Sequence, residues 1–134
     1  MTNNIATVQS IYAAFGQGDV PTILSYLSND VVFNHPVPAS IAPFGGDFIG
    51  KNDIPRFFMA LGSTVKTTNF VPANFREEGN KVINDVTHEG IVIPTGKSFS
   101  ITIPFTWTFN AQGEVEHWTG SDAVESLNNA LLGN

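Results

Sequence analysis

The chain has 134 residues, of which 42% are hydrophobic and 11% aromatic. This composition is too apolar for a disordered protein and the length suits one typical domain, so we expect a single domain over residues 1–134. The formal net charge is −6, and the six basic residues are scattered along the chain. Because phosphate backbones need a patch or stripe of cations, we expect no nucleic-acid partner.

The sequence contains no cysteine, which excludes disulfides, thiolate zinc sites and a cysteine nucleophile. The first ten residues, MTNNIATVQS, have neither a basic segment nor an apolar segment typical of a signal peptide. No uninterrupted apolar run approaches the ~20 residues that cross a bilayer. We therefore expect a cytoplasmic protein without a membrane partner.

Helices are expected in the first part of the chain. Residues 5–15 carry apolar side chains at helical spacing, and the stretch GQGD ends this helix. Asp19 is expected to cap a second, short helix with Pro21 in its first turn. The stretch VVFNH then predicts a short strand that ends at the following prolines, and a third helix is expected over residues 52–62.

After Gly62 the pattern changes to strands, expected over residues 64–75, 81–93, 99–109 and 114–122. The segments EEGN, PTGK and NAQG between them have turn composition, which favours antiparallel hairpins. Residues 123–132 predict a short closing helix. Helices followed by a strand meander indicate an α+β fold, in which three helices cover one face of a strongly curved antiparallel sheet and leave a cavity.

This order of elements, together with IYAAFGQGDVPTILSYLSNDVVFNHP and the terminal GEVEHWTGSDAVESL, resembles the nuclear transport factor 2-like (NTF2-like) superfamily. Within it, the sequence is similar to SnoaL-like polyketide cyclases, which are related to ketosteroid isomerases. The resemblance extends over nearly the whole chain. It implies a cone-shaped α+β barrel with the active site in its mouth, and a homodimer formed through the outer face of the sheet.

The resemblance also implies site residues. It places His35 where ketosteroid isomerases carry a base aspartate, and Asp122 at the acid/base aspartate of the cyclases. The tyrosine and the protonated aspartate that serve isomerases as oxyanion donors fall near Ile11 and Phe105. Both donors are therefore absent, and isomerase chemistry by that mechanism is not expected.

Alternation along the strands, in the register that the resemblance implies, turns His35, His88 and Asp122 into the cone as catalytic candidates. The expected substrate-binding wall is aromatic and consists of Phe33, Tyr12, Phe15, Phe57, Phe105, Trp107 and Trp118. A concave apolar pocket with few polar groups is typical of small-molecule sites. His117 alternates with Trp118 and is expected on the outer face.

The candidates have other interpretations. His35 could be a general base or a rim histidine bonded to backbone or water. Asp122 could be an acid/base or the N-cap of the closing helix. His88 beside His35 suggests a metal site, but two histidines without a placed carboxylate are a weak one, and we expect neither metal nor cofactor.

The leading hypothesis is a cofactor-free acid/base enzyme of isomerase, cyclase or hydratase type, acting on a hydrophobic cyclic or carbonyl compound. In this hypothesis His35 or Asp122 removes a proton α to a carbonyl, and His88 assists. The alternative is a non-catalytic ligand-binding or oligomerisation module, and a third is an accessory protein that recognises another polypeptide. The proline-rich segment PVPASIAPFGGDF could close the pocket as a lid or pack against a second subunit.

Overall fold

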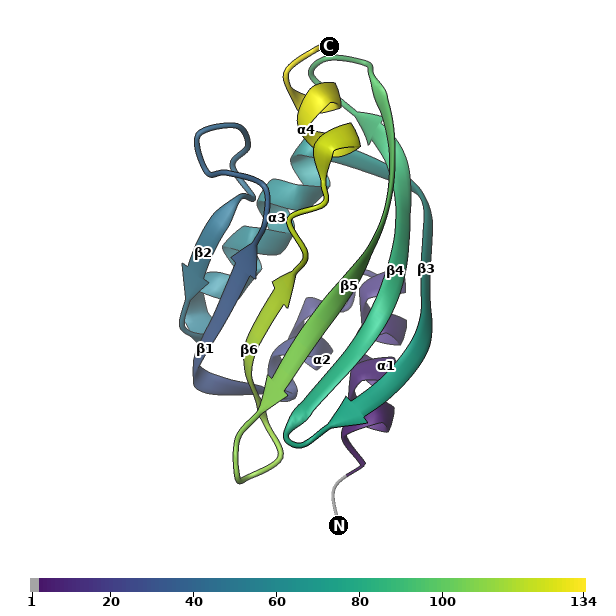
Figure 1. Ribbon diagram of the computed structural model, residues 1–134. Coiled ribbons are helices and arrows are strands. Elements are labelled where there is room, and N and C mark those ends of the chain that lie inside the picture. Colours follow the sequence, from purple (N-terminus) through teal and green to yellow (C-terminus); the bar gives the residue numbers. More distant parts are fainter. Residues whose placement is uncertain (1–2) are drawn as a thin grey trace.

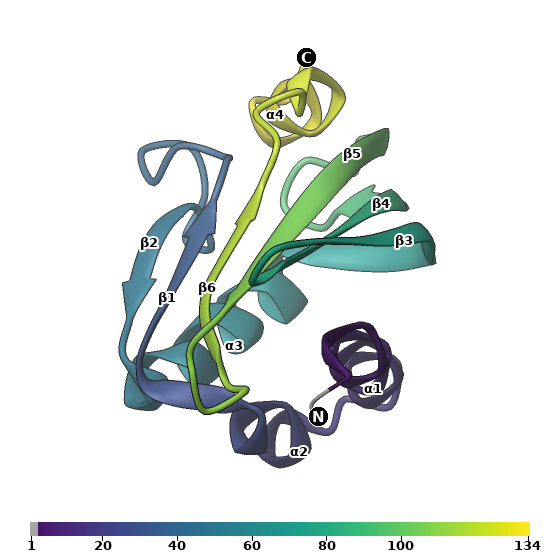
Figure 2. The ribbon, with the colours of Figure 1, turned by 60° about the horizontal axis from the view of Figure 1, so that its bottom comes forward.

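The computed structural model describes residues 3–134, in which helices pack against one curved sheet (Figure 1). The elements follow the chain in the order α1 (Asn4–Gly16), α2 (Val20–Ser25), β1 (Leu27–His35), β2 (Gly46–Ile49), η1 (Lys51–Asp53), α3 (Ile54–Thr64), β3 (Val65–Glu78), β4 (Lys81–Val92), β5 (Ser98–Phe109), β6 (Val115–Gly120) and α4 (Glu125–Leu131). Figure 2 shows the sheet curving round α1, α2 and α3. The α+β class with N-terminal helices and a curved sheet is confirmed.

The strands pair in the order β2-β1-β6-β5-β4-β3. Four of the five pairings are antiparallel, as the meander predicted, and β1 pairs with β6 in parallel. A parallel pair needs a long connection, which here contains the remaining strands and α3. The outer strands β2 and β3 do not pair with each other, so the sheet curves without closing into a barrel.

Local signals account for the first helices. α1 buries Val8, Ile11 and Ala14, which share one face at helical spacing. α2 begins directly after Asp19, whose carboxylate accepts a hydrogen bond from the backbone N–H of Thr22 at 3.3 Å, as predicted. No helix among residues 3–134 has both the length and the apolarity required to span a bilayer.

The segment after β1 differs from the sequence prediction. Gly46–Ile49 form β2, an edge strand on β1 that lies within residues expected to form a loop. Val37, Ala42 and Phe44 are buried in the core, and the Phe44 ring packs edge-on against His35 at 4.9 Å between centroids. The segment is therefore anchored by its own apolar side chains and is not a free lid.

Candidate functional site

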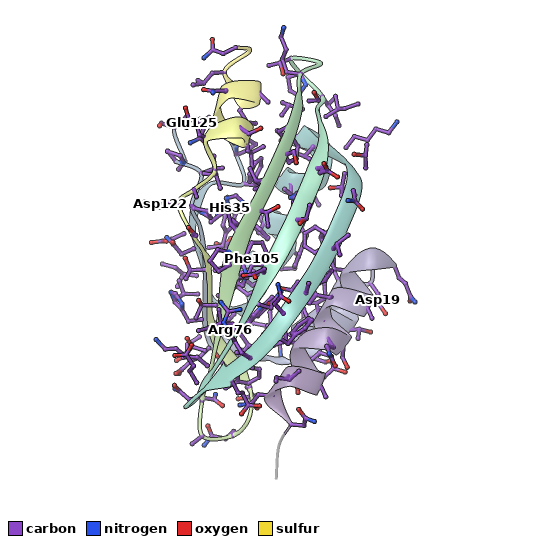
Figure 3. All side chains as sticks on the ribbon, turned by 45° about the vertical axis from the view of Figure 1, so that its right-hand side comes forward. Asp19, His35, Arg76, Phe105, Asp122 and Glu125 are labelled. Carbon is purple, nitrogen blue, oxygen red and sulfur yellow. The ribbon has the colours of Figure 1, made fainter. Side chains whose placement is uncertain are left out.

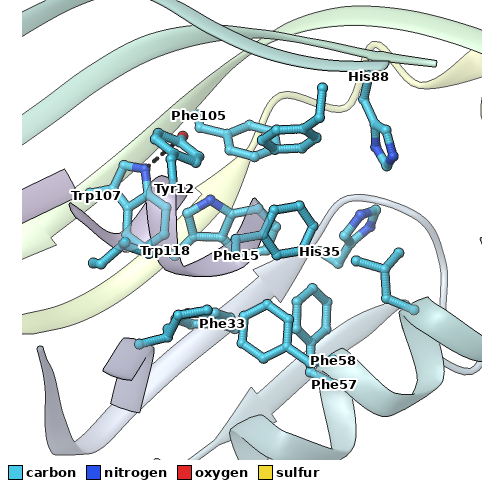
Figure 4. Close-up of a pocket in the computed structure, with 14 residues that line it drawn as sticks. Tyr12, Phe15, Phe33, His35, Phe57, Phe58, His88, Phe105, Trp107 and Trp118 are labelled. Atoms are coloured by element: carbon cyan, nitrogen blue, oxygen red, sulfur yellow. Dashed lines mark hydrogen bonds between the residues drawn. The ribbon is translucent and has the colours of Figure 1, made fainter. Parts of the chain in front are cut away.

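A pocket of about 60 Å³ lies between the sheet and α1, α2 and α3 (Figure 4). It is lined by Ile11, Tyr12, Phe15, Ile23, Phe33, His35, Phe57, Phe58, Leu61, Phe70, His88, Phe105, Trp107 and Trp118. Apart from the two histidines and the polar tips of Tyr12 and the tryptophans, this wall is hydrocarbon. No carboxylate, lysine or arginine of the described residues lines it, so the pocket is uncharged when both histidines are neutral.

The structure brings most of the sequence-proposed site residues to this one pocket. They are His35, His88, Phe33, Tyr12, Phe15, Phe57, Phe105, Trp107 and Trp118. They come from α1, α3 and four strands, so the pocket exists only once helices and sheet have packed. Their chemical roles stay predictions.

Asp122 lies outside the pocket (Figure 3). β6 ends at Gly120, so the alternation expected to turn Asp122 inward stops two residues before it, and its side chain is exposed. It does not cap the closing helix either, because α4 begins at Glu125 with Val124 at the N-cap position. The predictions that Asp122 faces the cavity or caps the helix are both wrong.

His35 ends β1, and its Nδ1 accepts a hydrogen bond from the backbone N–H of Val37 at 3.1 Å. A neutral imidazole whose Nδ1 accepts carries its proton on Nε2, so we assign Nε2–H as a donor. Burial and, to a smaller extent, the charge that His88 would carry lower the pKa of His35 to about 3. His35 is therefore neutral at physiological pH.

His88 lies on β4 with 7% of its surface exposed. Its ring packs edge-on between Phe70 and Phe99, with centroid separations of 5.2 and 5.1 Å. Its Nε2 lies 2.9 Å from the hydroxyl oxygen of Thr67, and burial lowers its pKa to about 4. Figure 4 shows the rings of His88 and His35 facing each other at one end of the pocket.

A hydrogen-bond chain closes the opposite end. Nε1 of Trp107 donates to the Tyr12 hydroxyl at 3.1 Å, and that hydroxyl donates to Oδ1 of the fully buried Asn84 at 2.8 Å. Burial raises the pKa of Tyr12 far above its ordinary value, so the phenol stays neutral. The indole N–H of Trp118 is also buried but has no hydrogen-bond partner within residues 3–134.

Sequence reasoning did not propose five of the lining residues, namely Ile11, Ile23, Phe58, Leu61 and Phe70. Helical periodicity marks the first four as buried, but it does not separate a pocket wall from solid core. Phe70 lies on β3 just after a register shift between Thr67 and Asn69. A bulge changes which side chains face inward, so simple alternation does not identify Phe70.

The arrangement offers two uncharged imidazoles to a molecule in the pocket. His35 can donate a hydrogen bond through Nε2, and the Nδ1 of His88 has no partner among the described residues. Residues 3–134 contain no group of three or more histidine, cysteine, aspartate or glutamate side chains placed to hold a metal ion. The pocket thus presents apolar walls together with two imidazoles that can hydrogen-bond an oxygen atom of a ligand.

Comparison with known proteins finds a matching family model and solved structures of similar fold. A family model described as a SnoaL-like domain matches residues 8–118. No curated protein sequence matches the chain. An NTF2-like protein of unknown function from Burkholderia pseudomallei is similar with a TM-score of 0.86 and 23% identity, over 98% of each chain.

Two further solved structures are similar. TerC, co-crystallised with polyporic acid, has a TM-score of 0.83 and 22% identity over 96% of this chain and 98% of its own. A Bacillus subtilis protein named as a candidate isomerase has a TM-score of 0.76 and 16% identity over 99% of this chain and 98% of its own. At these identities the similarity establishes the fold.

Proposed function

The chain belongs to the SnoaL-like domain family, and we propose that it binds a small, neutral, aromatic or cyclic carbonyl compound and catalyses a cofactor-free proton transfer on it. The observation that carries this proposal is the shared position of His35 and His88 at one end of an otherwise aromatic pocket. An isomerisation or an aldol-type cyclisation would use such a step. From the resemblance alone, we also propose that the protein acts as a homodimer.

In the proposed step, His35 donates Nε2–H to the carbonyl oxygen while Nδ1 of His88 removes the proton from the α carbon. Donation of Nε2–H from His88 to Thr67 would leave Nδ1 unprotonated and able to accept. The step leaves an enolate, whose oxygen His35 Nε2–H stabilises, and the proton then returns from His88 to another atom of that enolate, so no cofactor is consumed. This assigns to His35 the donor role and to His88 the base role.

The low proton affinity of the base restricts the substrate. A histidine with a pKa of about 4 is a weak base, and proton transfer is efficient only when donor and acceptor affinities are not far apart. We therefore propose a substrate with an acidic C–H bond, such as a carbon between two carbonyl groups. Aromatic side chains line the pocket, and such side chains pack well against flat rings, which supports a planar substrate.

The test uses benzoylacetone, an aromatic diketone whose enol converts to the ketone with a change in ultraviolet absorbance. We expect the protein to accelerate this conversion and His88→Asn to lower kcat by about 100-fold, the usual contribution of one acid/base group. His35→Asn should also lower kcat, although the amide oxygen can still accept from the Val37 N–H.

His117→Asn is the matched control, because His117 lies outside the pocket. It should retain the wild-type rate, and thermal unfolding of each variant should establish that it is folded. A rate equal to that of buffer, or an equal loss in His117→Asn, would contradict the proposed function.

A second candidate is a non-catalytic binding module for the same class of molecule. The observation in its favour is that both pocket histidines bind protons weakly and no carboxylate of the described residues lines the pocket. Such a module would bind benzoylacetone, detected by quenching of Trp107 and Trp118 fluorescence, without accelerating its conversion.

A further inference from the structure

A second cavity adjoins the pocket and shares part of its wall. We call it the outer groove; its volume is about 270 Å³, and it is lined by Phe15, Gly18, Val20, Ile23, Phe58, Leu61, Gly62, Val65 and Thr67. These residues come from α1, α2, α3, the turn before α2 and the start of β3. Phe15, Ile23, Phe58 and Leu61 line both cavities, so one layer of side chains separates them.

The pocket alone is too small for the proposed ligand. A cavity of about 150 Å³ is known to accept one benzene ring, whereas this pocket measures about 60 Å³. An aromatic ligand must therefore displace part of the wall. Phe33, Trp107 and Trp118 are almost fully buried, and moving any of them would disrupt the core.

The shared wall is the part that can move. Phe15 and Phe58 are only partly buried, and their rings lie 6.0 Å apart between centroids at an interplanar angle of 43°. Rotation of either ring toward solvent costs fewer packing contacts than rotation of a core ring. Such a rotation would join the pocket to the outer groove.

We propose that the ligand occupies both cavities, with its aromatic diketone head beside His35 and His88 and an unbranched, uncharged hydrocarbon tail in the outer groove. This inference rests on the function proposed above and specifies its substrate class. No ionisable side chain among the described residues lines the groove, so a charged tail would lose its hydration without gaining a partner. Thr67 lies between the pocket and the outer groove. It lines the groove, and its hydroxyl oxygen lies 2.9 Å from Nε2 of His88, which lines the pocket.

Gly62 allows the groove to be filled without touching the pocket. It lies in α3, and a Cβ built on it meets no atom within 4 Å. Gly62→Phe can therefore place a ring in the groove without a backbone clash. The neighbouring Ser63 is exposed and lines neither cavity, so Ser63→Phe adds the same ring outside the groove and serves as the matched control.

The experiment titrates tryptophan fluorescence with benzoylacetone and with homologues whose methyl group is replaced by propyl, pentyl or heptyl. For the wild type and Ser63→Phe, we expect the affinity to rise roughly twofold per added methylene, about half the full transfer effect because the groove is open on one side. Gly62→Phe should abolish this rise, while its affinity for benzoylacetone should change far less. Thermal unfolding should establish that both variants are folded.

The outcomes separate the two proposals. If benzoylacetone binds and the tail length has no effect, or if Gly62→Phe and Ser63→Phe behave alike, the outer-groove inference is wrong, and the binding step of the proposed function is unaffected. If neither benzoylacetone nor any homologue binds to the wild type, the proposed function fails and the inference fails with it. A rise with tail length that Gly62→Phe alone removes supports the inference.

Discussion

The two pocket tryptophans are equally buried, each with 4% of its surface exposed, but their indole N–H groups differ. Trp107 donates to Tyr12 at 3.1 Å, whereas Nε1 of Trp118 has no partner among the described residues. A buried polar group without a partner is destabilising, and a ligand oxygen would be one way to satisfy it. Substitutions at these two residues can therefore distinguish the contribution of ring burial to the free energy of unfolding from the contribution of the hydrogen bond.

We predict that Trp107→Phe destabilises the protein more than Trp118→Phe does, by about 1 kcal/mol. Both substitutions remove a similar volume, but only the first removes a hydrogen bond and leaves Tyr12 with one partner fewer. Urea unfolding followed by circular dichroism measures the difference. Equal free energies of unfolding, or a larger loss for Trp118→Phe, would contradict this view of the network.

Two glycines show how the elements next to the pocket are constrained. Gly45 ends the buried segment after β1, and a Cβ there would lie 2.3 Å from the carbonyl oxygen of Val37. The backbone of that segment leaves no room for a side chain. Gly62 lies near the end of α3 with free space around it, so its absence of a side chain only weakens the helix.

We therefore predict opposite effects for two identical substitutions. Gly45→Ala should lower the free energy of unfolding by roughly 2–3 kcal/mol, because the clash is with backbone. Gly62→Ala should raise it by roughly 0.5 kcal/mol, less than the full glycine-to-alanine difference because the position is close to the helix end. Urea denaturation of both variants is the measurement, and a stable Gly45→Ala protein would show that the segment can move away from the β1 end.

Burial of two histidines makes the stability of the whole molecule depend on pH. Their pKa values are lowered from 6.5 to about 3 for His35 and about 4 for His88. Between these values and 6.5 the unfolded chain binds more protons than the folded protein does. The free energy of unfolding consequently falls as the pH decreases from 6.5 toward 4, and this loss ends below the folded-state pKa values.

We predict that His88→Asn reduces the slope of the free energy of unfolding against pH between pH 6.5 and 4.5. The reduction should be at most about 1.4 kcal/mol per pH unit, the limit for one proton. Because the pKa of His35 is lowered even further, to about 3, His35→Asn should reduce the slope by a similar amount. Urea titrations at several pH values measure these slopes, with His117→Asn as the control. Identical slopes in the wild type and His88→Asn would show that His88 is not held neutral by burial in the folded protein.

Much of the fold could be predicted because its signals are local. The helical spacing of Val8, Ile11 and Phe15, the Asp19 cap and the turn segments between the later strands each depend on residues close in sequence. Alternation, in the register that the family resemblance implies, also placed Phe33, Trp107 and Trp118 as inward residues on regular strands, where it holds. It failed at Asp122, because the strand ends before that residue is reached.

By itself, then, the sequence determined the α+β class, most helices and strands, and an aromatic interior with His35 and His88. Only the tertiary structure decided that β1 pairs in parallel with β6, that Tyr12 bonds to Asn84, and that Asp122 faces solvent. The periodicity of apolar residues reports backbone geometry over a few residues. The three features above depend instead on how segments far apart in the chain pack against one another. The division of the interior into a pocket and an outer groove is likewise a result of packing between helices and sheet.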